Sequence, residues 1–82
     1  TKALAKELGP SGIRVNCVSP GGIRNPDAPQ GEDFQKNYGA RCPMGRMAEL
    51  QEMTGAVMYF ASDAAGYTTG QNLVVDGGMT AW

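Results

Sequence analysis

Two short runs of apolar and β-branched residues, at positions 13–18 and 72–75, each lead within three residues into a pair of glycines. The first run alternates apolar and polar residues, which is typical of a strand. The second run is almost continuously apolar, as in a strand that is covered on both faces of a parallel sheet. Paired glycines after a strand indicate a sharp change of chain direction. These runs therefore predict two short strands that end in tight turns.

The residues between the two runs predict an amphipathic helix. Over residues 49–62 the apolar side chains recur three or four positions apart, which places them on one helical face. We expect this face to lie in the core; it consists of Leu50, Met53, Val57 and Phe60. Glu49 and Glu52 stand near the expected helix start, where carboxylates interact favourably with the helix dipole.

A loop and a smaller helix complete the pattern. Residues 24–32 contain too many turn formers for a regular element. A short helix is expected after them, with Asp33 as its N-cap and Gly39 at its end. The order is helix, strand, loop with a small helix, long helix, strand. This order predicts an α/β fold in which a right-handed crossover joins two parallel strands.

The chain opens within a helical pattern. Residues 1–8 predict a helix whose apolar face includes Leu4 and Leu8, and Gly9, followed by proline, is expected to end it in the left-handed conformation. A chain of 82 residues makes at most one domain, with a small core. Because the chain starts with Thr1 rather than Met and is already helical in pattern there, the sequence resembles a helix cut open.

Charge and hydropathy exclude several classes of partner. The formal net charge is −1, and the basic residues are scattered, so no surface for nucleic acid is predicted. The longest uninterrupted apolar run, residues 56–61, is far shorter than the roughly 20 residues of a membrane helix. Neither nucleic acid nor membrane is therefore an expected partner.

Histidine is absent, so the chain offers no imidazole for metal binding or acid–base catalysis. Cys17 and Cys42 lack the spacing of a zinc or redox pair, and no metal site is predicted. Two unpaired thiols favour a reducing, cytoplasmic setting. Cys17 is expected in the core, and Cys42, in a loop, is expected to be more exposed.

Six sequence blocks together resemble the short-chain dehydrogenase/reductase family. They occur in that family's order and spacing, and they read ALAKEL at 3–8, GIRVN at 12–16, SPGGI at 19–23, PMGR at 43–46, FASD at 60–63 and GQNLVVDGG at 70–78. The resemblance implies a Rossmann-type three-layer α/β/α fold with a parallel sheet, of which this chain is the C-terminal part. Residues 1–82 are then a single partial domain, and the N-terminal cofactor half is absent.

The same resemblance places the family's Gly-rich phosphate loop, catalytic Ser and Tyr-x-x-x-Lys motif upstream of Thr1. Tyr38, Tyr59 and Tyr67 are not followed by lysine four residues later. No catalytic residue is therefore assigned to this chain, and the chain alone is expected to be inactive.

Part of a cofactor site is implied by the resemblance. Open α/β sheets bind ligands beyond the carboxyl ends of their strands, and in the family the Pro-Gly segment after the first strand approaches the nicotinamide. Two glycines there allow close approach without a Cβ collision. The family often has Thr where this chain has Asn25, whose amide can still donate to a phosphate. The residues predicted to bind NAD or NADP are Pro20, Gly21, Gly22, Ile23 and Asn25.

Residues 25–42 match the family's variable substrate lid, although a solvated surface loop explains them equally well. The lid residues singled out are Phe34, Tyr38 and Arg41. We expect Phe34 and Tyr38 to pack the lid down rather than to touch substrate. Arg24 and Arg41 are each candidates for an anionic group.

The function implied is NAD(P)-dependent hydride transfer between the cofactor and an alcohol or ketone, with a sugar-related substrate favoured. Two alternatives stay open: an enoyl-thioester reductase of the same family, and a structural or oligomerisation module without chemistry. The resemblance also implies a homotetramer, with Met58, Tyr59 and residues 79–82 at a subunit interface. Asp76 is interpreted as a turn residue rather than a catalytic carboxylate.

Overall fold

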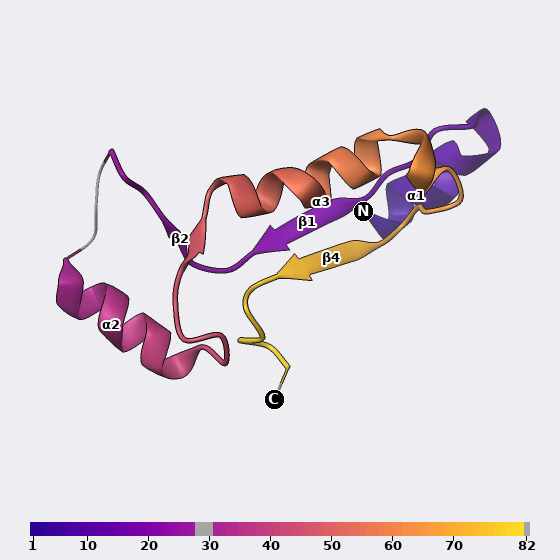
Figure 1. The fold of residues 1–82 in the computed structure, drawn as a ribbon. Helices are drawn as coiled ribbons and strands as arrows, with labels where there is room; N and C mark the ends of the chain where they lie inside the picture. The colour runs from indigo at the N-terminus through magenta and orange to yellow at the C-terminus, as the bar shows by residue number, and fades with distance from the viewer. Residues whose placement is uncertain (28–30, 82) are drawn as a thin grey trace.

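The computed structural model of the chain describes residues 1–27 and 31–81. The described elements are, in chain order, α1 (Lys2–Leu8), β1 (Cys17–Pro20), β2 (Ile23–Arg24), α2 (Glu32–Arg41), β3 (Ala48–Glu49), α3 (Gln51–Ala61) and β4 (Asn72–Val75), with short 3₁₀ turns at Gly9–Ser11 and Asp63–Ala65. Figure 1 shows these elements along one elongated body.

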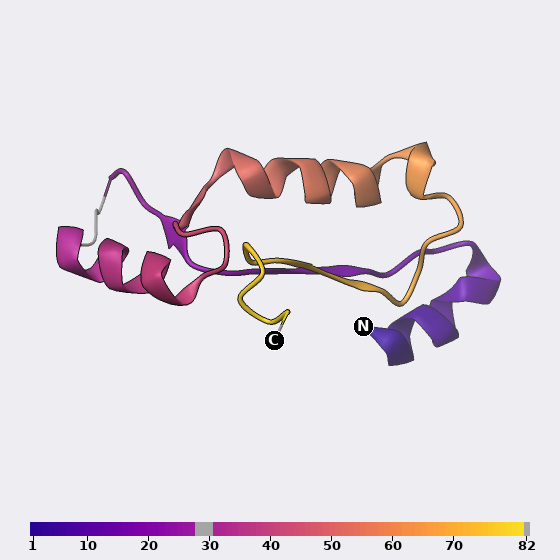
Figure 2. The same cartoon turned by 60° about the horizontal axis from the view of Figure 1, so that its bottom comes forward.

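The two main strands are parallel neighbours, as the sequence predicts. β1 pairs with β4 in a register that runs from Cys17 opposite Asn72 to Pro20 opposite Val75. Helix α3 precedes β4 and packs against both strands. Figure 2 shows α3 on one side of this sheet and α1 on the other, near the amino ends of the strands. The arrangement is therefore α/β/α in miniature.

The molecule is far from spherical. Its radius of gyration is 15.6 Å, and its extents are 49 × 29 × 19 Å. A compact domain of this length has a radius of gyration of about 12 Å. Helix α2 lies at one end and α1 at the other, so much of the sheet has no second layer of this chain against it.

β1 begins and ends later than the sequence predicts. Residues 13–16 are not part of the ladder but bond to the 68–71 turn: the Val15 N–H donates to the Thr69 hydroxyl at 3.0 Å, and the Val15 carbonyl accepts from the Gly70 N–H at 2.8 Å. The Asn16 amide donates to the Thr68 carbonyl at 2.9 Å, and its oxygen accepts from the Gln71 N–H at 3.0 Å. The strand then continues through Ser19 to Pro20, which the sequence placed in the turn.

The end of α1 is also shifted. Gly9 has right-handed helical angles and continues into the 3₁₀ turn, and the left-handed glycine is Gly12, with φ of 77°. The prediction that Gly9 adopts the left-handed conformation was therefore wrong, and the left-handed residue lies three positions later. The buried residue of α1 is Ala5, whereas Leu4 is half exposed.

Helix α2 is longer than predicted. It begins at Glu32 after Gly31, no side chain caps it, and Asp33 lies inside its first turn. Gly39 does not end the helix but lies buried within it. A Cβ on Gly39 would stand 2.5 Å from the Gly45 carbonyl oxygen, so this glycine permits contact between α2 and the following loop.

Helix α3 presents a different face to the strands than expected. Met53 is buried, and Ala56 and Phe60 are half buried. Leu50 and Val57, which were expected in the core, are 65% and 54% exposed. The face that the sequence marks as apolar is therefore wider than the face that this chain covers.

A second sheet was not predicted. β2 and β3 form a parallel pair with Ile23 opposite Ala48 and Arg24 opposite Glu49. Each strand has two residues, too few to show a period in the sequence. This small sheet joins the chain beyond β1 to the segment that leads into α3.

Candidate functional site

The Pro-Gly-Gly segment lies at the carboxyl end of the main sheet. Pro20 is the last residue of β1, and the Gly21 N–H continues the ladder by donating to the Val75 carbonyl at 2.9 Å. The Gly22 carbonyl then accepts from the Ala48 N–H at 2.9 Å, which starts the second sheet. Residues 20–23 therefore connect the two sheets at the edge where open α/β sheets bind ligands.

The two glycines face the chain itself. A Cβ on Gly22 would stand 2.6 Å from two ring atoms of Tyr38, and a Cβ on Gly21 would stand 3.0 Å from Asp76 Cα. The sequence interpretation was that these glycines leave room for a ligand. On the side where their Cβ atoms would stand, that interpretation is wrong, because Tyr38 and Asp76 already fill the space.

An ion pair fixes the residues that follow. Arg24 donates from Nε and Nη2 to the two carboxylate oxygens of Glu49, at 2.8 and 2.9 Å. These hydrogen bonds raise the pKa of Arg24 and lower the pKa of Glu49. Arg24 is therefore engaged within the chain, contrary to its prediction as a candidate for an anionic ligand.

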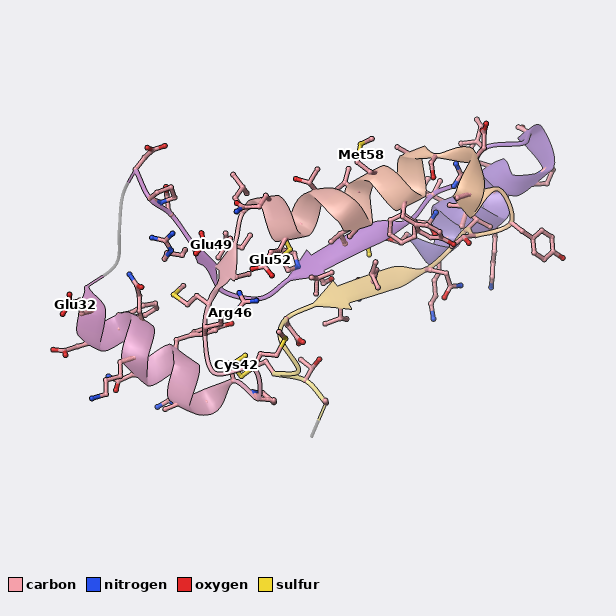
Figure 3. All side chains as sticks on the ribbon, viewed as in Figure 1. Glu32, Cys42, Arg46, Glu49, Glu52 and Met58 are labelled. Atoms are coloured by element: carbon pink, nitrogen blue, oxygen red, sulfur yellow. The ribbon has the colours of Figure 1, made fainter. Side chains whose placement is uncertain are left out.

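A second two-pronged ion pair lies beside the first (Figure 3). Arg46 donates to both Glu52 oxygens at 2.7 and 3.0 Å, and Glu52 Oε1 also accepts the Glu49 N–H at 2.9 Å. The Arg46 bonds, followed by the backbone bond, lower the pKa of Glu52 to about 2. Glu52 thus ties the first turn of α3 to Arg46 and Glu49, which precede the helix.

An open hollow borders the segment after the glycines. It encloses about 420 Å³ and is lined by Ile23, Arg24, Asn25, Pro26 and Leu50. Ligand sites commonly measure about 300–1,000 Å³. Asn25 Oδ1 accepts the Asp27 N–H at 3.0 Å, so its amide nitrogen is the group left to face a ligand as a donor. The volume and this donor fit part of a nucleotide.

A smaller cavity lies behind the glycines. It encloses about 70 Å³, and Gly21, Gly22, Tyr38, Met53 and Asp76 are among its walls. This volume is too small for a nicotinamide ring, so the cavity is part of the support of the segment.

The three lid residues have different surroundings. Tyr38 packs on the glycines and accepts the Gly22 N–H at its hydroxyl, which agrees with the expectation that it holds the lid down. Phe34 is 54% exposed and does not pack the lid, contrary to expectation. Phe34 and Arg41 instead line an open hollow of about 230 Å³ on α2, and predicted lid residues 28–30 lie outside the described residues.

Cys42 was predicted to be the more exposed cysteine and is the more buried one. It is 6% exposed, and its thiol lies 3.5 and 3.4 Å from the Asp76 and Gly77 carbonyl oxygens. Cys17, expected in the core, is half buried, and both thiols are free. The loop around Cys42 is covered because the turn after β4 folds back over it.

Asp76 acts in that turn, as the sequence suggests. Its carboxylate accepts the Gly78 N–H at 3.0 Å, and it accepts the Thr80 N–H and hydroxyl at 3.1 and 2.7 Å. The Thr80 hydroxyl is the largest cause of the lowered pKa of Asp76. A carboxylate with these three donors is a poor proton acceptor, so it has a structural role.

Sequence reasoning missed the two ion pairs and assigned Glu49 and Glu52 only to a helix dipole. The spacing of Arg46 and Glu52 across the start of α3 is the signal that could have indicated one pair. Arg24 and Glu49 are 25 positions apart, and nothing in the sequence joins them. In the described ranges 1–27 and 31–81, no cluster of side chains suits a metal ion, and no helix there is long and apolar enough to span a membrane.

The geometry defines a class: a parallel βαβ unit with a glycine-rich strand end beside an open hollow, as in nucleotide-binding α/β proteins. Comparison with known proteins makes this more specific. A family model described as enoyl-(acyl carrier protein) reductase matches residues 1–80. The chain belongs to the short-chain dehydrogenase/reductase family.

Three relatives illustrate the similarity. The chain is 46% identical over 81 residues to 3-alpha-(or 20-beta)-hydroxysteroid dehydrogenase of Mycobacterium bovis, covering 99% of this chain and 30% of that protein. It is 44% identical over 86 residues to D-arabinitol 2-dehydrogenase of Candida tropicalis, with the same coverage. A short-chain dehydrogenase of Leptospira borgpetersenii with bound NAD⁺ superposes with a TM-score of 0.89 and 49% identity, over 98% of this chain and 30% of that one.

These comparisons confirm the family and the Rossmann-type α/β fold. They also confirm the nicotinamide cofactor at the level of the family, since a solved relative holds NAD⁺. The chain spans about 30% of the length of the curated relatives it matches.

Proposed function

We propose that these 82 residues are the C-terminal part of the single domain of an NAD(P)-dependent oxidoreductase. The observation that carries the proposal is the position of residues 20–23, at the carboxyl end of β1 and beside the hollow lined by Ile23 and Asn25. Family membership supports the class of oxidoreductase, and the chain covers about 30% of each relative's length.

In this proposal, Pro20 to Ile23 approach the nicotinamide and Asn25 donates to a cofactor phosphate. The bound nicotinamide supplies or accepts the hydride that interconverts a ketone and an alcohol. The chain's own residues bind and orient the cofactor, and α2 with Phe34 and Arg41 forms part of the substrate lid. The proton-transferring residues belong to the portion of the domain before Thr1, and this chain alone is inactive.

The substrate class proposed is a small alcohol or ketone. A sugar-related substrate is supported by the similarity to D-arabinitol 2-dehydrogenase, and a steroid is its competitor. We also propose a homotetramer, with exposed Met58 and Tyr59 of α3 at an interface; Met58 points away from the strands in Figure 3. The tail's Trp82 lies outside the described residues. The two free thiols support a cytoplasmic setting.

Enoyl-thioester reduction is the second candidate, because the matching family model carries that description. The two reactions differ in the bond reduced, C=C against C=O. Purified full-length protein should therefore be assayed with NADH and NADPH against ketones and against an enoyl thioester. Turnover of the thioester alone would replace the main proposal. If the protein binds neither NADH nor NADPH, the remaining candidate is a structural or oligomerisation module without chemistry.

The cofactor assignment is tested at Asn25 in the full-length protein. Replacing Asn25 by alanine removes the donor, and we expect NADH or NADPH to bind about 2- to 10-fold more weakly, as for loss of one hydrogen bond. Asn25→Thr restores a hydroxyl donor and serves as the matched control. Fluorescence titration measures both. Equal affinity in the wild type and Asn25→Ala would remove Asn25 from the site.

A further inference from the structure

We infer that Tyr38 is a positioning residue: α2 uses its side chain to set the backbone of Gly21 and Gly22, and position 22 is glycine because of Tyr38. The inference rests on the proposed function, since the segment being positioned is the one assigned to the nicotinamide. It differs from that assignment in one respect. The glycine serves an internal contact instead of the approach of a ligand.

The steric evidence is specific to one partner. The three atoms nearest to a Cβ built on Gly22 all belong to Tyr38, at 2.6, 2.6 and 2.9 Å. Gly22 is not among the glycines with positive φ, so its backbone conformation is open to alanine. The nearest obstacles to a side chain at position 22 are therefore atoms of Tyr38.

Hydrogen bonds also fix the orientation of the backbone at Gly21 and Gly22. The Gly22 N–H donates to the Tyr38 hydroxyl, while the Gly22 carbonyl accepts from Ala48 in β3. The preceding N–H, of Gly21, donates to Val75 in β4. Three backbone groups of the two glycines are thus bonded to β4, α2 and β3. Of these three supports, Tyr38 is the one that is a side chain.

This arrangement couples the lid to the site. Helix α2 contributes Tyr38 from its second turn, and the same helix carries Phe34 and Arg41 on the hollow proposed for the lid. A displacement of α2 withdraws the Tyr38 hydroxyl from both glycines and the Tyr38 ring from Gly22. The conformation of the segment assigned to the nicotinamide therefore depends on the position of the lid helix.

A size-exchange experiment in the full-length protein separates the two explanations of Gly22. Gly22→Ala should clash with the Tyr38 ring and weaken NADH binding roughly 5- to 100-fold, as overpacking does. The double variant Gly22→Ala/Tyr38→Leu removes the clashing ring atoms, so its affinity should return to that of Tyr38→Leu alone. If glycine is needed for the cofactor, the double variant stays as weak as Gly22→Ala.

The hydroxyl is tested separately, which also covers a failure of Gly22→Ala to fold. Tyr38→Phe keeps the ring and loses the bond to Gly22, so NADH should bind about 2- to 10-fold more weakly. A purely structural role would lower the thermal unfolding midpoint and leave the affinity of the folded protein unchanged. The inference is supported if the double variant regains the affinity of Tyr38→Leu and if Tyr38→Phe binds NADH more weakly than the wild type.

Two matched controls use the same substitutions elsewhere. Gly55→Ala adds a Cβ where nothing lies within 4 Å, and Tyr59→Phe removes a hydroxyl that lies 3.1 Å from Thr68 Oγ1. Both should keep the wild-type affinity for NADH. A double variant without rescue, in a protein whose wild type binds NADH, overturns the inference alone. A wild type that binds neither NADH nor NADPH overturns the proposed function together with the positioning role.

Discussion

The sheet region, residues 1–20 and 50–75, and the strand-end region, residues 21–49 and 76–81, differ in how much apolar surface they leave uncovered. Among the described residues, nine of the eleven exposed large hydrophobic side chains lie in the sheet region, and only Phe34 and Met44 lie in the strand-end region. Exposed apolar surface of this extent marks a face that is normally covered. The sheet region therefore leaves more of its apolar surface uncovered by this chain than the strand-end region does.

The strand-end region is held together by contacts between its own side chains and backbone. Arg24 pairs with Glu49, and Asp76 holds the final turn over buried Cys42. The Tyr38 contact with Gly22 belongs to the same set. Contacts within the strand-end region therefore hold the geometry of the proposed site, whereas the sheet region beside it keeps much apolar surface exposed.

The largest expected effect concerns the sheet region as a whole. The 82-residue chain expressed alone should show no cooperative thermal transition by circular dichroism, because two strands with exposed apolar faces are marginal in water. A sharp, reversible melt of the isolated chain would break the comparison, since the sheet would then need no other cover. The full-length protein is the positive control.

The next largest effect sharpens the comparison within the strand-end region. Gly39→Ala places a Cβ against the Gly45 backbone and should destabilise the full-length protein by about 1–3 kcal/mol. Gly55→Ala, on the open side of α3, should instead stabilise it by about 0.5–1 kcal/mol. Urea denaturation measures both. Equal effects at the two positions would contradict the packing described for α2.

The Glu52 ion pair gives a pH-dependent effect. Its folded pKa of about 2 lies below the ordinary value of 4.5, so its contribution to stability is complete above the ordinary pKa and disappears as the pH falls toward 2. The stability difference between wild type and Glu52→Gln should therefore shrink over that interval. Urea denaturation between pH 2 and 7 tests this, and Glu7→Gln on α1 is the control. A difference independent of pH would exclude the ion pair as its origin.

The smallest effect belongs to the sheet region. Tyr59→Phe removes one exposed hydroxyl bond to Thr68 and should change stability by less than about 0.5 kcal/mol. The measurement is again urea denaturation of the full-length protein. A larger loss would show that side-chain hydrogen bonds support the sheet region as well, which would weaken the distinction between the two regions.

The regular elements were largely predictable from sequence. The β-branched run before the first glycine pair, the apolar run at 72–75 and the helix between them all have clear periods, and the parallel pairing of β1 with β4 follows from their order. The position of residues 20–23 at the carboxyl edge follows in turn. Strand β1 begins later than predicted because Val15 and Asn16 bond to the 68–71 turn instead of to a neighbouring strand.

The supports of the site were not predictable. β2 and β3 have two residues each, and a pattern needs more. Gly39 resembles a helix stop, yet it is required by the approach of Gly45, a tertiary contact. Tyr38 reaches Gly22 across 16 positions, and Arg24 reaches Glu49 across 25. Such contacts depend on the folded chain path, which local propensity does not contain.

The two cysteines lie in different regions and differ in burial, so each reports on its own region. Cys42 is covered by the turn after β4, and a thiol reagent can reach it only when that turn lifts. Cys17 is half buried in β1 and is reachable without such an opening. The alkylation rate of Cys42 therefore measures how often the strand-end region opens while the rest of the protein stays folded. Cys42 thus reports the opening of the turn after β4, which lies beside the segment proposed to bind the cofactor.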